Sequence, residues 1–274
     1  MKFSKYHALG NDYIVLDAQA VEMEINSQVV RRICDRHYGI GSDGLLLGLL
    51  PSPGCDFGLR LFNPDGSEFE KSGNGLRIFA RYLWDHGLVQ GDLFSVETPG
   101  GVVRCQVFPS GEVVSVEMGL VSFHSRAIPV AGPDREVLDE TLELDGMEFR
   151  YCAATIGNPH CVLIRDEVSK AEARLWGPRI EVDRRFPNRI NVQFMQVLDR
   201  ANIRIEIWER GAGYTLASGS SSCAAAATAH RLGCCEPEIT VHMPGGELAV
   251  SLSPQYHATL TGPVAWICEG EFSI

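Results

Sequence analysis

The sequence repeats itself at an interval of about 146 residues. The segment GNDYIVL, which begins at Gly10, returns as GNPHCVL from Gly157. Three further anchors follow in the same order in both halves: LRLF from Leu59 and IEIW from Ile205, Ser72-Gly73 and Ser218-Gly219, and Pro99-Gly100-Gly101 and Pro244-Gly245-Gly246. Anchors that keep one order and nearly one spacing indicate a duplication. The chain is therefore predicted to contain two copies of one folding unit.

The length of 274 residues suits two domains of ordinary size, each with its own buried core. We expect an N-terminal domain over residues 1–120, to which a C-terminal strand over 263–274 returns. The C-terminal domain is expected over 121–262. The boundary is placed in the segment 118–133, which is rich in glycine and proline.

Short alternating or β-branched segments, bounded by Gly, Pro, Asn and Asp, predict half-buried antiparallel strands. The clearest are 93–98, 101–108 and 112–118 in the first half, and 190–197, 202–208 and 247–253 in the second. Residues 27–39 form an amphipathic pattern with a serine start and a glycine stop, which predicts a helix.

Two further helices are predicted directly after the repeated serines. Residues 76–84 are apolar apart from two arginines, and residues 223–229 are nearly all alanine. Helices that are apolar around most of their circumference belong in a protein interior. The predicted fold is therefore α+β, with two pseudo-symmetric domains, each a curved and mostly antiparallel sheet wrapped around a central helix.

Composition excludes several classes of partner. The formal net charge of −11 disfavours binding to nucleic acid, which requires a basic surface. The nine cysteines are odd in number and never spaced C-x-x-C, so they predict reduced thiols rather than disulfides or a zinc site. The sequence has neither a signal-peptide pattern nor an apolar run of about 18 residues, so we expect a cytoplasmic protein without a membrane partner.

Cofactor motifs are also missing from the sequence. Residues 39–44 satisfy G-x-G-x-x-G, but they follow a predicted helix and precede a strand, the reverse of the dinucleotide-binding order. We find no phosphate-binding loop and no pyridoxal-phosphate lysine motif. His7 and His160 lack carboxylates or cysteines at metal-ligand spacing, so both are interpreted as structural histidines. We expect no cofactor and no metal.

The repeated serines, Ser72 and Ser218, stand where the two central helices begin. A helix N-terminus presents unpaired N–H groups and about half a positive charge, so it binds carboxylates. Either serine, taken alone, is typical of an ordinary N-cap. As a duplicated pair, the two helix starts are expected to meet in a cleft and to hold one carboxylate, with a serine on each side of the adjacent carbon. The residues expected to supply the backbone amides are Gly73, Asn74, Gly219 and Ser220.

Other polar residues fall at positions that the duplication would bring near this cleft: Asn11 and its equivalent Asn158, Asn63 and its equivalent Glu209, and Asn191 and Arg210. Each asparagine taken singly is typical of a turn. Together they supply a carboxylate for an ammonium group, a guanidinium for a second carboxylate, and amides for orientation. This set suits a small amino acid.

The chain resembles the diaminopimelate epimerases, which invert an α-carbon without pyridoxal phosphate. The resemblance runs through NPDGSE from Asn63, SGNGLR from Ser72, GNPHCV from Gly157, FPNRINVQF from Phe186 and ERGAGYTLASGSSSCAA from Glu209. It implies a mechanism in which one cysteine thiolate removes the α-proton and a second cysteine returns a proton to the opposite face. Ser72 and Ser218 occupy both cysteine positions. A serine hydroxyl has a pKa several units above the thiol value of about 8.5. Ionising the serine instead of a cysteine therefore costs roughly 5 kcal/mol or more in additional free energy.

The resemblance also assigns substrate contacts. Asn11, Asn158, Asn191 and Arg210 match positions that hold the distal end of diaminopimelate, whereas Asn63 and Glu209 match those around the reacting ammonium. Three places depart from the family pattern: Gly44 stands for a glutamine, Tyr214 for a glutamate, and Ser221-Ser222 for a Gly-Ala pair.

Three functions stay open at this point. The first is an isomerase that epimerises diaminopimelate or a close analogue, in lysine and peptidoglycan-precursor synthesis. The second is a divergent racemase or dehydratase for another amino acid. The third is a catalytically inactive amino-acid-binding homologue or a cysteine-to-serine variant that traps ligand. The expected partner is a small amino acid, and a homodimer is among the assemblies we consider.

Overall fold

The computed structural model describes residues 1–273 and divides the chain into two compact units. The N-terminal unit comprises Met1–Glu117 and the segment that begins at Thr261, and the C-terminal unit comprises Met118–Leu260. The chain thus leaves the first unit, builds the second, and returns.

The N-terminal unit is built on a mostly antiparallel sheet. Its elements are β1 (Lys2–Ala8), β2 (Asn11–Asp17), α1 (Ser27–Cys34), β3 (Leu45–Leu50), β4 (Phe57–Phe62), β5 (Glu68–Phe69), α2 (Gly73–Asp85), β6 (Phe94–Thr98), β7 (Gly101–Val107), β8 (Val113–Leu120) and β18 (Ala265–Glu271). β1–β2, β3–β4, β4–β5, β6–β7 and β7–β8 pair antiparallel, and β18 adds to β1. β2–β3 and β4–β6 are parallel because α1 and α2 serve as crossovers.

The C-terminal unit repeats this arrangement. Its elements are β9 (Glu140–Leu144), β10 (Met147–Thr155), β11 (Pro159–Ile164), α3 (Lys170–Glu181), β12 (Asn191–Asp199), β13 (Asn202–Glu209), β14 (Gly213–Thr215), α4 (Gly219–Arg231), β15 (Glu238–Met243), β16 (Gly246–Leu252) and the first part of β17 (His257–Pro263), which continues into the N-terminal unit from Thr261. β10–β11, β12–β13, β13–β14 and β15–β16 pair antiparallel, and β9 adds to β10. β11–β12 and β13–β15 are parallel, across α3 and α4. Apart from β7–β8, each pairing given for the N-terminal unit has a counterpart in the C-terminal unit, which confirms the predicted α+β fold of two duplicated halves.

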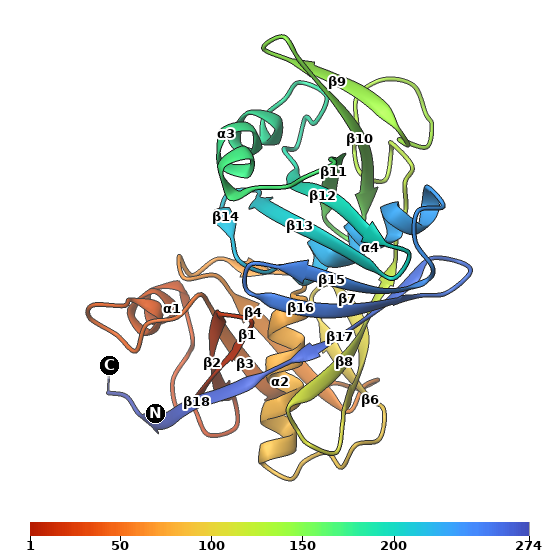
Figure 1. Ribbon diagram of the computed structural model, residues 1–274. Coiled ribbons are helices and arrows are strands. Elements are labelled where there is room, and N and C mark those ends of the chain that lie inside the picture. Colours follow the sequence, from red (N-terminus) through yellow and green to blue (C-terminus); the bar gives the residue numbers. More distant parts are fainter. Residues whose placement is uncertain (274) are drawn as a thin grey trace. The chain divides into compact units, whose positions relative to one another are not determined.

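The helices α2 and α4 are the central helices of their units (Figure 1). α2 packs against β1, β2, β3 and β7, and α4 packs against β10, β11, β12, β13, β15 and β16. Leu76, Ile78 and Phe79 are fully buried in α2, and the alanine run of α4 is fully buried as well. The burial of both helices is what their apolar sequences predict.

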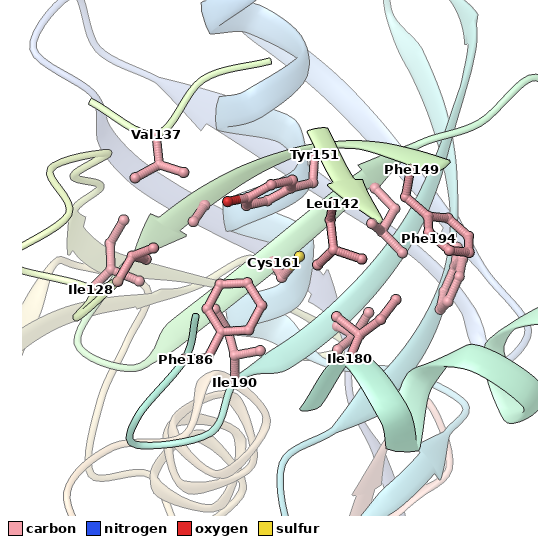
Figure 2. Packing of buried hydrophobic residues seen from close by; sticks show 14 of the residues in the cluster. Ile128, Val137, Leu142, Phe149, Tyr151, Cys161, Ile180, Phe186, Ile190 and Phe194 are labelled. Carbon is pink, nitrogen blue, oxygen red and sulfur yellow. The ribbon is translucent and has the colours of Figure 1, made fainter. Parts of the chain in front are cut away.

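The helices α1 and α3 cover the other face of each sheet. In the N-terminal unit, Val30 and Ile33 of α1 pack against Ile14 and Leu16 of β2. In the C-terminal unit, Ile180 of α3 belongs to the cluster drawn in Figure 2, together with residues of β9 to β12. Strands β2 and β11 are therefore buried on both faces, which explains their continuous apolar sequences.

One helix was predicted with wrong boundaries, and another was missed. The helix predicted over 27–39 ends at Cys34, because the Asp35 carboxylate accepts the N–H groups of His37 and Tyr38 and turns the chain. Its N-cap is Asn26 rather than Ser27. Helix α3 was not predicted at all. Its apolar pattern is weak, and it contains Pro178.

All nine cysteines lie within the described residues and are free thiols there. Within residues 1–273, none of the helices combines the length and the apolar character needed to cross a membrane.

Gly48 of β3 tests how closely the central helix approaches its sheet. A Cβ atom at this position would lie 2.1 Å from Cε2 of Phe79 in α2. We expect Gly48→Ala to lower the free energy of unfolding by about 1–3 kcal/mol, because the packed interface must shift. Urea denaturation provides the measurement. The matched control is Gly54→Ala, which meets no atom within 4 Å and should change the free energy by less than about 0.5 kcal/mol. Equal effects would contradict the close approach.

Candidate functional site

The two repeated serines are the N-caps of the central helices. Ser72 precedes α2 with φ −138° and ψ 124°, and Ser218 precedes α4 with φ −148° and ψ 124°. Both helices therefore begin at the glycine that follows the serine, earlier than the sequence predicts. The first amides of each helix have no acceptor within the helix, so each unit presents one helix end with N–H groups directed out of the helix.

The hydroxyl groups of the two serines have different partners. The oxygen of Ser72 accepts the N–H of Gly75 at 3.0 Å, as an ordinary N-cap does. Within the described residues the side chain of Ser218 makes no such capping bond. The Ser218 hydroxyl lowers the pKa of the Glu209 carboxyl, and this carboxylate accepts the hydroxyl of Thr215 at 3.1 Å.

The environment of Glu209 makes it more basic than an ordinary glutamate. Burial raises the pKa of this carboxyl above 4.5, although the hydrogen bonds from Ser218 and Thr215 oppose the shift. The equivalent residue of the N-terminal unit is Asn63, whose amide donates to the hydroxyl of Ser67 at 3.0 Å. The C-terminal unit thus gives its serine a carboxylate neighbour, while an uncharged amide stands at that position in the N-terminal unit.

Each helix end is tied to the loop between the first two strands of its duplicated motif. In the N-terminal unit the amide of Asn74 donates to Oδ1 of Asn11 at 3.0 Å. In the C-terminal unit the amide of Asn158 donates to the hydroxyl of Ser220 at 3.2 Å. Asn11 and Asn158 are equivalent in the duplication, as are Asn74 and Ser220, so the two units make the same kind of contact at each helix end.

Further bonds fix Asn11 and Asn158. Asn11 donates to Oδ2 of Asp43 at 3.0 Å. His160 is buried and its Nε2 lies 2.9 Å from Oδ1 of Asn158. Burial lowers the pKa of His160 to about 3, so its imidazole is neutral at pH 7. A neutral imidazole donates Nε2–H to Asn158 and orients its amide.

An ion network centred on the buried Asp12 supports the N-terminal group. Asp12 receives Arg36 at 2.6 Å and Lys5 at 2.9 Å, and Arg36 also pairs with Asp43 at 2.7 Å. Burial alone would raise the pKa of Asp12, but the hydrogen bonds from Arg36 and Lys5 lower it to about 2. Sequence reasoning missed Arg36 and Asp43, because ion pairs between separate loops leave no local pattern.

Asn191 holds the backbone beside Arg210. Its amide donates to the carbonyl of Pro159 at 2.8 Å, and its Oδ1 accepts the N–H of Arg210 at 2.9 Å. The side chain of Asn191 is buried, whereas Arg210 is exposed and donates from Nη1 to the carbonyl of Asn188 at 3.1 Å. Both ends of the Asn191 amide are therefore engaged by backbone groups, which leaves the Arg210 guanidinium as the outward-facing polar group of this pair.

The departures from the family pattern have local explanations. A Cβ atom on Gly44 would lie 2.5 Å from Cε1 of Tyr13, so the tyrosine ring requires glycine there. Tyr214 donates to Glu206 at 2.6 Å, and its ring lies 5.2 Å from Nζ of Lys170 and 5.1 Å from Cζ of Arg174. These cation–π contacts bind β14 to α3.

The extra serines of α4 are buried and satisfied. Ser221 accepts the amide of Gln193 at 3.0 Å, and Ser222 donates to the carbonyl of Ser218 at 2.8 Å. They are structural hydrogen-bonding groups within the C-terminal unit.

The chain matches the family model described as diaminopimelate epimerase over residues 3–124 and 152–267. It is 58% identical over 273 residues to diaminopimelate epimerase 2 of Nostoc sp. (strain PCC 7120), an alignment that covers 100% of the chain and 96% of the relative. It is 40% identical over 279 residues to the diaminopimelate epimerase of Moorella thermoacetica, with 100% of both sequences covered.

Solved structures with the same fold are more distant in sequence. A hydroxyproline epimerase from Agrobacterium vitis matches with a TM-score of 0.71 and 16% identity, covering 98% of this chain and 90% of that one. A phenazine biosynthesis protein of Bacillus anthracis matches with a TM-score of 0.72 and 16% identity, covering 100% and 99%. These likenesses concern the fold alone.

Proposed function

Because the chain belongs to the diaminopimelate epimerase family, we propose that it is an isomerase that acts at the α-carbon of diaminopimelate, without pyridoxal phosphate, in lysine biosynthesis. The observation that carries the proposal is the duplicated pair of serine-capped helix ends, at Ser72 and Ser218. The proposed location is the cytoplasm, a reducing compartment that suits free thiols.

The two helix ends together form the proposed site for the reacting carboxylate. Its ligands are the backbone amides at the start of α2 and α4, which supply N–H donors and positive potential. Negative charge develops on this carboxylate when the α-proton leaves, so the same donors stabilise the carbanion more than the ground state. The ammonium group lies between the amide of Asn63 and the carboxylate of Glu209 in this proposal.

Glu209 gives Ser218 a route to act as a base. Ser218 Oγ takes the α-proton while its own hydroxyl proton passes to the Glu209 carboxylate, so no free alkoxide forms. Epimerisation is completed when Ser72 donates its hydroxyl proton to the opposite face. Ser72 then carries the unfavourable alkoxide, because its neighbour at the duplicated position is Asn63. Proton removal on the Ser218 side is therefore the easier step, and inversion is the harder one.

A catalytically silent amino-acid-binding protein is the second candidate. It is favoured by Ser72, whose oxygen serves as a helix cap without a basic partner at the equivalent of Glu209. Incubation of the protein with LL-diaminopimelate in heavy water separates the two functions. Deuterium at the α-carbon, followed by mass spectrometry, supports an enzyme. Binding without exchange at high protein concentration supports the second candidate.

Glu209→Gln should lower the rate of α-deuterium exchange by about 10²–10⁴-fold, because the amide cannot accept the proton of Ser218. The residue must be ionised to act as a base. The exchange rate of the unaltered protein should therefore rise with pH through an inflection above 4.5, the ordinary glutamate value. The Gln variant should lose that inflection. The matched control is Glu206→Gln on the same strand, which should keep the pH profile. A pH profile unchanged by Glu209→Gln would exclude its role as base.

Ser72→Cys combined with Ser218→Cys should raise the rate of epimerisation by about a thousandfold or more, because a thiol near pKa 8.5 ionises far more readily than a hydroxyl. Ser72→Cys alone should give most of the gain in inversion, since Ser218 already has Glu209 beside it. Chiral chromatography of LL- and meso-diaminopimelate measures the product. A double variant that binds diaminopimelate but stays inactive would show that the serines are not what limits activity.

A further inference from the structure

The turn that carries Glu209 and Arg210 is held by a buried carboxylate of α3. Glu181, the last residue of this helix, is 6% exposed. Its Oε2 accepts the indole N–H of Trp208 at 2.8 Å, and its Oε1 accepts the backbone N–H of Gly211 at 3.1 Å. Arg189, itself largely exposed, lies 3.4 Å from Oε1. All these partners belong to the C-terminal unit.

The backbone of this turn is held by its own conformation and by hydrogen bonds with side chains. It connects β13 to β14, and Gly211 and Gly213 adopt φ values of 77° and 85°, which favour glycine. Two successive backbone N–H groups are captured by side chains, that of Arg210 by Asn191 and that of Gly211 by Glu181. The direction of the Arg210 side chain is thus fixed from both flanks of its backbone.

The N-terminal unit holds the equivalent turn in a different way. Arg31 of α1 donates from Nη1 to the carbonyl of Asp65 at 2.9 Å, and a Cβ atom on Gly66 would lie 2.5 Å from the carbonyl oxygen of Ser27. A cation that binds a carbonyl in one unit is thus replaced by an anion that binds an amide in the other. The carboxylate of Glu181 thus holds the turn that carries the guanidinium of Arg210.

We propose that Glu181 is a positioning residue that sets the selectivity of the site for a second carboxylate, by holding the turn from which Arg210 projects. This inference rests on the proposed function, in which Arg210 pairs with the distal carboxylate of diaminopimelate. Glu181 does not touch the ligand, because its oxygens are buried and bonded to Trp208, Gly211 and Arg189. A carboxylate also suits the indole N–H better than an amide would, since both of its oxygens accept.

The test compares two ligands that differ in the distal carboxylate, LL-diaminopimelate and L-lysine, by calorimetric titration. Glu181→Ala should weaken the binding of diaminopimelate about tenfold or more and that of lysine less than about twofold. In the Arg210→Ala background, Glu181→Ala should cause little further loss of affinity, because both changes remove the same interaction, that of Arg210 with the distal carboxylate. The matched control is Glu172→Ala, which removes another α3 carboxylate that pairs with Arg165 and should leave both affinities unchanged.

Glu181→Gln tests the same idea with the side-chain volume kept. Its amide oxygen can still accept Gly211 N–H, but its NH₂ group would face the Trp208 N–H. We expect a smaller loss that is still selective for diaminopimelate. Hydrogen exchange provides a readout that is independent of ligand: the Gly211 amide should lose protection in Glu181→Ala and keep it in Glu172→Ala.

Three outcomes would overturn the proposal: equal losses for diaminopimelate and lysine, losses that add fully to those of Arg210→Ala, or unchanged protection of Gly211. They are distinct from a failure of the proposed function, which would appear as an unaltered protein that does not bind diaminopimelate while Gly211 still depends on Glu181.

Discussion

Each unit is organised around one constraint, the buried N-terminus of its central helix. A helix such as α2 or α4, enclosed by strands, must still satisfy or use the amides of its first turn. The fold brings a loop to that end in both units, so that Asn74 meets Asn11 and Ser220 meets Asn158. In the proposed function the same geometry that completes the helix end also binds the substrate carboxylate. Structural capping and ligand binding are then two uses of one feature.

Duplication supplies two copies of this feature, and divergence has made them unequal. Ser72 accepts a helix amide, whereas Ser218 makes no capping bond and lowers the pKa of the Glu209 carboxyl. The difference follows from a single duplicated position, occupied by Asn63 in one unit and by Glu209 in the other. The clamps behind the two turns differ as well, with Arg31 in one unit and Glu181 in the other. Chemistry that needs two different faces is served by such asymmetry, although the folds remain the same.

The repeat and the helix-start signals in the sequence were enough to predict the paired halves, the central helices and the serine caps. It did not find α3, whose few buried positions form a weak pattern, nor the early end of α1, which depends on the Asp35 side chain. Contacts such as Thr215 with Glu209 and Glu181 with Gly211 were also missed. Thr215 lies within the motif that begins at Glu209 and could have been suspected from it. Glu181 could not, because its role depends on how a helix packs against a distant turn.

Approximate free energies indicate how far the fold compensates for having serine instead of cysteine at each position. The deficit of a hydroxyl relative to a thiol is roughly 5 kcal/mol or more. A helix N-terminus stabilises nearby negative charge by about 0.3–2 kcal/mol. At Ser218 the proposed transfer of the hydroxyl proton to Glu209 also avoids a free alkoxide, so much of the deficit is offset. Ser72 has the helix end alone, and its oxygen is already committed to Gly75. In the proposed mechanism the step at Ser72 therefore limits inversion.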